Sequence, residues 1–216
     1  MIDLVSDRAD GSATVRVWDP VVRVFHWALV AAFATAWATA DEVQPVHEYA
    51  GYTVVGLVAF RLAWGFAGSR YARFAQFVKG PGATLAYLGS MLRGRERRYL
   101  GHNPAGAAMI LALLLTLSGT AFTGWLMAEP DRVAMLPALP PIVAPAWADE
   151  DGDEQDEGRE VEGVLEDIHE TLANLILLLA ALHVGGVVFA SVRHRENLAR
   201  AMITGDKRAP ETGDIA

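Results

Sequence analysis

Apolar residues gather in four long blocks along the chain, separated by polar, proline-rich or charged segments. The blocks cover roughly residues 21–40, 49–67, 104–127 and 168–192. An α-helix needs about 20 apolar residues to cross a bilayer, and each block is close to that length. The pattern predicts an all-α membrane protein that is a bundle of four transmembrane helices.

The rest of the chain predicts a single membrane domain with short ends. We expect the domain to cover residues 19–200, with an N-terminal segment at 1–18 and a tail at 201–216. The pairs Asp19-Pro20 and Asn103-Pro104 each place a capping side chain directly before a proline. This arrangement is typical of a helix start, so the first and third helices should begin at these prolines.

Charge is unevenly distributed between the loops. The loop at 68–102 contains seven Lys and Arg against a single Glu, and the tail after the fourth block is also basic. The loop at 129–167 contains thirteen acids against two Arg. Because basic segments stay on the cytoplasmic side of a membrane, we expect both termini and the basic loop to face the cytoplasm.

The acidic outer loop is expected to stay in water. Its run PALPPIVAP (residues 137–145) is too rich in proline for regular helix, and DEDGDEQDEGRE (residues 149–160) is typical of a solvated segment. Cysteine is absent from the chain. Its absence excludes disulfides, thiolate metal sites, iron–sulfur clusters and covalently attached c-type haem.

Four of the six histidines lie in or beside the apolar blocks, where a histidine is costly and indicates function. His26 and His183 lie fifteen and sixteen residues from the acids that mark the outer helix ends. At ~1.5 Å per residue, both are roughly 22–24 Å below the outer surface. His47 and His169 lie at the outer rim. The four histidines therefore form two levels, each with a pair drawn from two different helices.

The fourth helix contributes one histidine to each level. His169 and His183 are fourteen residues apart, which places them about 40° apart around the helix and roughly 21 Å apart along it. Ala173 and Ala180 on the same face leave room for a bulky group. Two imidazoles from different helices, repeated at two levels, are typical of bis-histidine haem b, in which the iron is ligated from both sides.

Two other interpretations of the histidines remain open. Each histidine could instead be a hydrogen-bonded polar residue that joins helices. A haem-free metal-ion or proton transporter could also use intramembrane histidines, although the spans lack acids away from their ends. His102 and His194 lie among arginines at the cytoplasmic edge, where we expect interfacial or solvated side chains.

Arg61 is a lone cation inside the second block, fourteen residues after His47 and so at the depth of the inner histidine pair. One interpretation is that its long side chain reaches the cytoplasmic interface. The other is that it pairs with a propionate of the inner haem and tunes the haem potential. The two interpretations are compatible.

Several motifs around these residues follow one another in an order that indicates a protein family. They are VWDPVVRVFHW around His26, HEYAGY around His47, FRLAWGFAGSRYARF from Phe60, GHNPAGA from Gly101, and the paired histidines of the last block. In this order the chain, from residue 15 to 207, resembles the bacterial cytochrome b561 family. That family is related to the b-type cytochrome subunits of nickel–iron hydrogenases.

The resemblance implies a four-helix bundle with two b haems (protohaem IX) that passes electrons between the quinone pool and a redox partner. It implies His26 and His183 as iron ligands of the inner haem, and His47 and His169 as iron ligands of the outer haem. These are the pairs that the depth count gives. It also implies a respiratory protein of the bacterial inner membrane, in contact with lipid and quinone.

The acidic loop at 129–167 is unusually long and acidic for the family. Such a loop suits a basic partner, for example a c-type cytochrome, although a solvated spacer without a partner is the alternative. A hydrogenase-like complex is another candidate partner, with this chain as its membrane anchor subunit. No nucleic acid is expected among the partners.

We expect an electron carrier with no substrate chemistry at the iron, because bis-histidine ligation leaves no open iron position. An enzymatic step would be quinone oxidation or reduction at a haem edge. Glu48, Asp167 and Glu170 surround the outer histidine pair and could exchange protons with a quinol.

Overall fold

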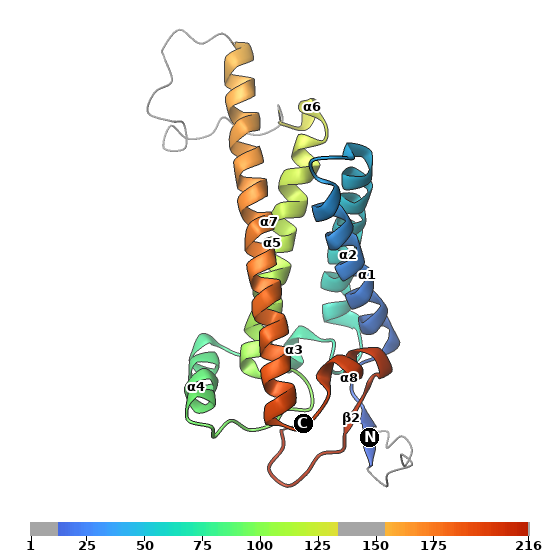
Figure 1. Cartoon of the computed structure of the whole chain (residues 1–216), viewed down its shortest axis with the longest axis vertical. Coiled ribbons are helices and arrows are strands. Elements are labelled where there is room, and N and C mark those ends of the chain that lie inside the picture. Colours follow the sequence, from blue (N-terminus) through green and yellow to red (C-terminus); the bar gives the residue numbers. More distant parts are fainter. Residues whose placement is uncertain (1–12, 134–153, 216) are drawn as a thin grey trace.

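Four long helices form the molecule in a computed structural model, which describes residues 13–133 and 154–215 (Figure 1). They are α1 (Pro20–Thr39), α2 (Gln44–Ala67), α5 (Pro104–Met127) and α7 (Glu154–Arg193). Helix α1 packs on α2, α2 on α5, and α5 on α7. Each is long and apolar enough to cross a membrane. The structure confirms the predicted all-α bundle of four candidate transmembrane helices.

Short elements lie at the two ends of the bundle. We call the end at which the described chain begins and ends the inner end, and the opposite end the outer end (Figure 1). Helix α6 (Pro130–Val133) lies at the outer end. The inner end holds β1 (Thr14–Arg16), α3 (Phe74–Phe77), α4 (Pro81–Leu92), α8 (Leu198–Thr204) and β2 (Asp206–Arg208).

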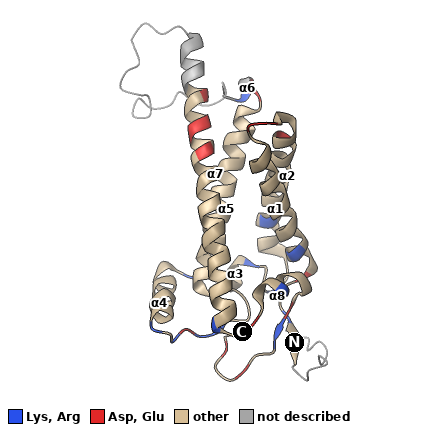
Figure 2. Ribbon diagram, viewed as in Figure 1, with Lys and Arg blue, Asp and Glu red and all other residues tan. Residues whose placement is uncertain are grey.

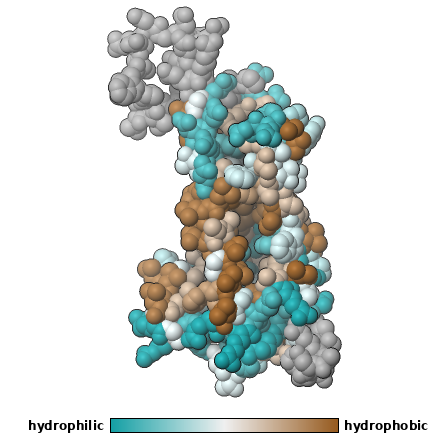
Figure 3. Space-filling view, in the orientation of Figure 1, coloured by the Kyte–Doolittle hydropathy of each residue, from teal (hydrophilic) through white to brown (hydrophobic). Residues whose placement is uncertain are grey.

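The surface of the bundle is suited to a lipid environment. A band of hydrophobic side chains covers the middle of the face in Figure 3, between hydrophilic ends. Large apolar side chains such as Leu115 and Leu178 point outward, with exposed fractions of 76% and 57%. Exposing so much contiguous apolar surface to water is unfavourable, so lipid covers it. The chain is a multi-pass membrane protein.

The helix starts follow from capping chemistry. The Asp19 carboxylate accepts a hydrogen bond from the Val22 backbone N–H at 2.9 Å, and the Asn103 side chain accepts one from the Gly106 N–H at 2.8 Å. Each cap satisfies a backbone donor that the first helical turn leaves free. The predicted starts of α1 and α5 are confirmed.

Two helices begin earlier than the apolar blocks. Helix α2 begins at Gln44, which places His47 in its first turn, and α7 begins at Glu154, inside the acidic loop. No proline interrupts the chain between Glu154 and Arg193. Hydropathy marks where a helix enters the apolar layer, whereas the helix itself extends until a breaking residue. The run PALPPIVAP and the first five residues of DEDGDEQDEGRE lie outside the described residues.

An apolar layer fills the middle of the bundle. Val54, Val58, Leu117 and Ile176 form its buried centre, and side chains of α1 such as Phe33 pack against them. All four long helices contribute to this layer. Ile176 lies seven residues from His169 and seven from His183, so the layer separates the two histidine levels.

The ends of the chain fold onto the inner end of the bundle. Strand β1 pairs antiparallel with β2, with Val15 opposite Lys207. Buried Arg98 forms ion pairs with Glu196 at 2.7 Å and with Asp214, and Lys207 lies 3.5 Å from Glu196. Residues 13–18 and 201–215, which the sequence places outside the helical domain, therefore pack together at the inner end of the bundle.

Figure 2 shows most Lys and Arg at this inner end and the acids of α7 toward the outer end. The basic loop at 68–102 and both described ends of the chain thus share one side of the bundle. The charges are therefore distributed as the sequence predicts, and the orientation of the inner end toward the cytoplasm stays a prediction.

Candidate functional site

The structure brings the four span histidines together in two pairs. His26 of α1 faces His183 of α7, with ring centroids 6.4 Å apart. His47 of α2 faces His169 of α7, with ring centroids 6.1 Å apart. These are the pairs that depth along the helices predicts, and each joins α7 to a helix from the other half of the bundle.

The spacing between the rings shows whether each pair has room for an iron between its two imidazoles. Two imidazoles joined directly by a hydrogen bond would have ring centres roughly 5 Å apart. With metal–nitrogen bonds of about 2 Å, two imidazoles on opposite sides of one iron have ring centres roughly 6 Å apart. The observed separations of 6.4 Å and 6.1 Å fit the second arrangement. The residues present therefore fit a bis-histidine iron.

In the outer pair, hydrogen bonds determine which ring nitrogen of each histidine carries the proton. His47 Nδ1 lies 2.8 Å from the Ala36 carbonyl, which can only accept, so this nitrogen carries the proton. His169 Nδ1 lies 2.9 Å from the Thr123 hydroxyl, and that hydroxyl donates to the Thr120 carbonyl at 3.0 Å. The hydroxyl therefore accepts from His169 Nδ1. In a neutral ring with its proton on Nδ1, Nε2 is the nitrogen that is available to a metal, so both hydrogen bonds favour the tautomer that a ligand requires.

The outer site also depends on a glycine. A Cβ at Gly124 of α5 would come within 3.0 Å of His169 Cε1. The missing side chain lets α5 approach the imidazole closely enough for Thr123 to reach it. The acids Glu48, Asp167 and Glu170 are all exposed near this end, so they are accessible to protons from water.

The inner pair lies in a different environment. His26 Nδ1 is buried and has no hydrogen-bond partner among the described residues. Its ring meets the neighbouring Trp27 ring edge-on at 5.0 Å. No group of three or more His, Cys, Asp or Glu that could hold a bare metal ion occurs in the described part of the chain.

Arg61 does not extend into solvent. Its side chain is buried, with 5% of the residue exposed, and its Nη2 donates to the Ala72 carbonyl at 3.2 Å. The guanidinium lies 5.1 Å from the centre of the Phe74 ring. Its Nη1 has no hydrogen-bond partner among the described residues. The side chain thus reaches the loop at the inner end of the bundle, where α3 and the preceding loop cover it, so that it is buried under protein and does not extend into water.

His102 is the residue whose environment the sequence does not reveal. The sequence predicts an interfacial or solvated side chain, yet the ring packs against Trp18 and Phe77, with each pair of ring centroids 4.6 Å apart. Burial, followed by the nearby charges of Arg61 and Lys207, lowers the pKa of His102 to about 3, so the ring is neutral. The one feature of the sequence that indicates an ordered environment for His102 is its position directly before Asn103, the residue that caps α5.

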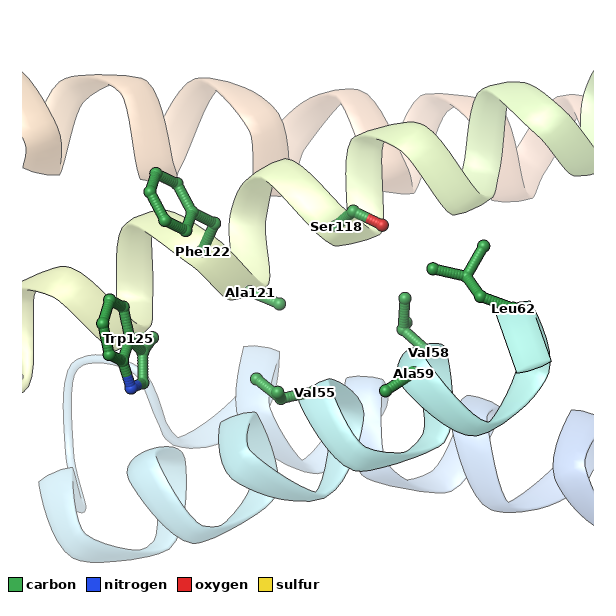
Figure 4. Close-up of a pocket in the computed structure, with 8 residues that line it drawn as sticks. All are labelled: Val55, Val58, Ala59, Leu62, Ser118, Ala121, Phe122 and Trp125. Carbon is green, nitrogen blue, oxygen red and sulfur yellow. The ribbon is translucent and has the colours of Figure 1, made fainter.

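An apolar groove between α2 and α5 is separate from the histidines (Figure 4). It has a volume of about 310 Å³ and includes Val55, Leu62 and Trp125, and none of the paired histidines lines it. Its one hydroxyl, on Ser118, donates to the Leu114 carbonyl at 2.7 Å. The groove can hold an apolar chain, but it offers no group for proton transfer.

Comparison with protein families gives one match. The family model described as prokaryotic cytochrome b561 matches residues 17–205. This range includes both histidine pairs, Arg61 and His102. No curated protein and no solved structure matches the chain.

Proposed function

The chain belongs to the prokaryotic cytochrome b561 family, and from that premise we propose that it binds two b haems and connects the quinone pool to a redox partner. The family is one of b-type cytochromes that transfer electrons in membranes. The observation that carries the proposal is the pair of imidazole spacings, 6.4 Å and 6.1 Å, at two levels of one bundle.

Each haem would be held by histidines of two helices. His26 and His183 would ligate the inner iron, and His47 and His169 the outer iron. When bound, each haem supplies a one-electron Fe(III)/Fe(II) couple. With two histidines as ligands, an iron held by either pair would have no position free for small molecules such as oxygen, and the haem would serve electron transfer rather than substrate chemistry at the iron.

The chain's own residues set the conditions for this transfer. Ala36 and Thr123 hold the outer imidazoles in the ligating tautomer. The layer around Ile176 keeps water and ions out of the space between the two levels. The exposed acids at the outer rim could receive protons from a quinol.

The inner end, which is basic, would face the cytoplasm of a bacterial inner membrane. The acidic segment at 129–167 would then lie outside, where it suits a cationic partner such as a c-type cytochrome. If a large complex co-purifies with the chain instead, the chain is an anchor subunit of that complex.

The proposal is tested by counting haems in purified protein and recording a dithionite-reduced minus oxidised spectrum. We expect two b-type haems per chain, and about one in His183→Ala and in His169→Ala. His194→Ala is the matched control and should keep both. A folded preparation from haem-supplied cells that lacks haem would overturn the proposal and return the transporter hypothesis.

A further inference from the structure

The inner end of the bundle contains buried hydrogen-bond donors that lack an acceptor. Arg61 Nη1, His102 Nδ1 and Tyr71 Oη are all buried and have no partner among the described residues. Each of these groups can donate a hydrogen bond. A Cβ on Gly101 would lie within 2.8 Å of the Tyr71 ring, so the chain holds Tyr71 against the residue that precedes His102.

The described chain compensates the charge of Arg61 only in part. The Asp19 carboxylate lies near enough to interact with it, but this carboxylate already accepts hydrogen bonds from the Val22 N–H and the Ser69 hydroxyl, and no ion pair to Arg61 is found among the described residues. A buried donor without an acceptor is unfavourable, and an anionic oxygen satisfies a guanidinium better than a neutral carbonyl does, because hydrogen bonds between charged groups are stronger. The site is therefore suited to an anionic oxygen ligand.

The position of the site indicates which anion. By its position along α2, Arg61 lies at the depth of the inner histidine pair. His102 belongs to the same cluster of side chains, because Arg61 lies 5.1 Å from the centre of the Phe74 ring, Phe74 lies 5.8 Å from Phe77, and Phe77 lies 4.6 Å from His102. The nearby Lys207 is already used, because its Nζ donates to the carbonyls of Tyr99 and Leu100. A haem held between His26 and His183 carries two propionate carboxylates, and these are the anions within this apolar region.

We propose that Arg61 and His102 together bind a propionate carboxylate of the inner haem, Arg61 through Nη1 and His102 through Nδ1–H. The inference rests on the proposed function and adds His102, a residue outside the four ligands. The rings of Trp18 and Phe77 pack against the His102 ring and hold it in place, and the Asn103 cap fixes the neighbouring backbone. A positioned donor of this kind neutralises carboxylate charge next to the iron and so favours the reduced state.

The test is a redox titration of both haems in the purified holoprotein. In Arg61→Gln we expect one of the two midpoint potentials to fall by about 59 mV, which is a tenfold change in the equilibrium constant for one-electron reduction. In His102→Phe the same midpoint potential should fall less, by the equivalent of about a threefold change in that equilibrium constant. The other midpoint should stay unchanged. His194→Gln, at the same end of the molecule, is the control and should alter neither midpoint.

A second measurement covers the case in which His102→Phe does not accumulate. In His102→Gln, which keeps a donor, redox-induced infrared difference spectra should show a shifted propionate carboxylate band with two haems still bound. Unchanged midpoints and an unchanged carboxylate band overturn the inference, as does a variant that alters only quinone reduction. Wild-type protein without haem would instead overturn the proposed function itself.

Discussion

Replacing Gly124 by alanine tests whether the close approach of α5 to His169 is needed for the outer haem. The new Cβ would lie 3.0 Å from His169 Cε1 and 3.5 Å from Nδ1, whereas ordinary contacts are 3.4–4 Å. The imidazole must therefore move by a few tenths of an ångström, while metal–ligand distances tolerate only about 0.2 Å. Overpacking of this kind costs about 1–3 kcal/mol, or roughly 5- to 150-fold in haem affinity.

The direction of the effect distinguishes this explanation from general destabilisation. Alanine is a better helix former than glycine by about 1 kcal/mol, so α5 itself should not be weakened. We expect Gly124→Ala to remain folded in detergent but to lose the outer haem faster to a haem-scavenging protein. The control is Gly56→Ala, because Gly56 is exposed and a Cβ there meets nothing within 4 Å. Wild-type haem content and wild-type loss rates in Gly124→Ala would refute the reasoning.

Two further predictions concern residues outside the proposed ligand sets. Thr123→Val removes the acceptor of the His169 Nδ1 proton, which makes the imidazole less basic. Haem affinity at the outer site should fall about 10- to 100-fold and the outer midpoint should rise, as a redox titration would show; an unchanged midpoint contradicts this. Burial alone would raise the pKa of Glu196, but hydrogen bonds from Arg98 and the charge of Lys207 lower it. The ionised Glu196 carboxylate therefore stabilises the folded state above the ordinary glutamate pKa of about 4.3, and this contribution is lost as the pH falls through the lowered pKa of Glu196. Glu196→Gln should release the C-terminal segment at neutral pH, at a cost of about 3–5 kcal/mol, which hydrogen exchange of residues 206–215 would detect. Equal protection in the variant and the wild type would count against this role.

The sequence by itself determined the membrane architecture and the levels of the histidines. Both depend on local chemistry, since a span needs a fixed length of apolar residues and a rise of ~1.5 Å per residue converts sequence distance into depth. The starts of α1 and α5 were equally local, because Asp19 and Asn103 satisfy the backbone of their own first turn. The start of α7 could not be found in this way, because its first turns lie in polar sequence.

Only the tertiary structure decided the spacing between the rings and the partners that orient them. The acceptor for His47 is a carbonyl of α1, and the acceptor for His169 is a hydroxyl of α5, contacts that depend on how helices pack rather than on periodicity. The sequence alone predicts an interfacial or solvated His102, because the residues that pack against it, Trp18 and Phe77, come from two distant segments. The packing of long-range partners, which no local pattern encodes, turns it into a buried donor beside Arg61.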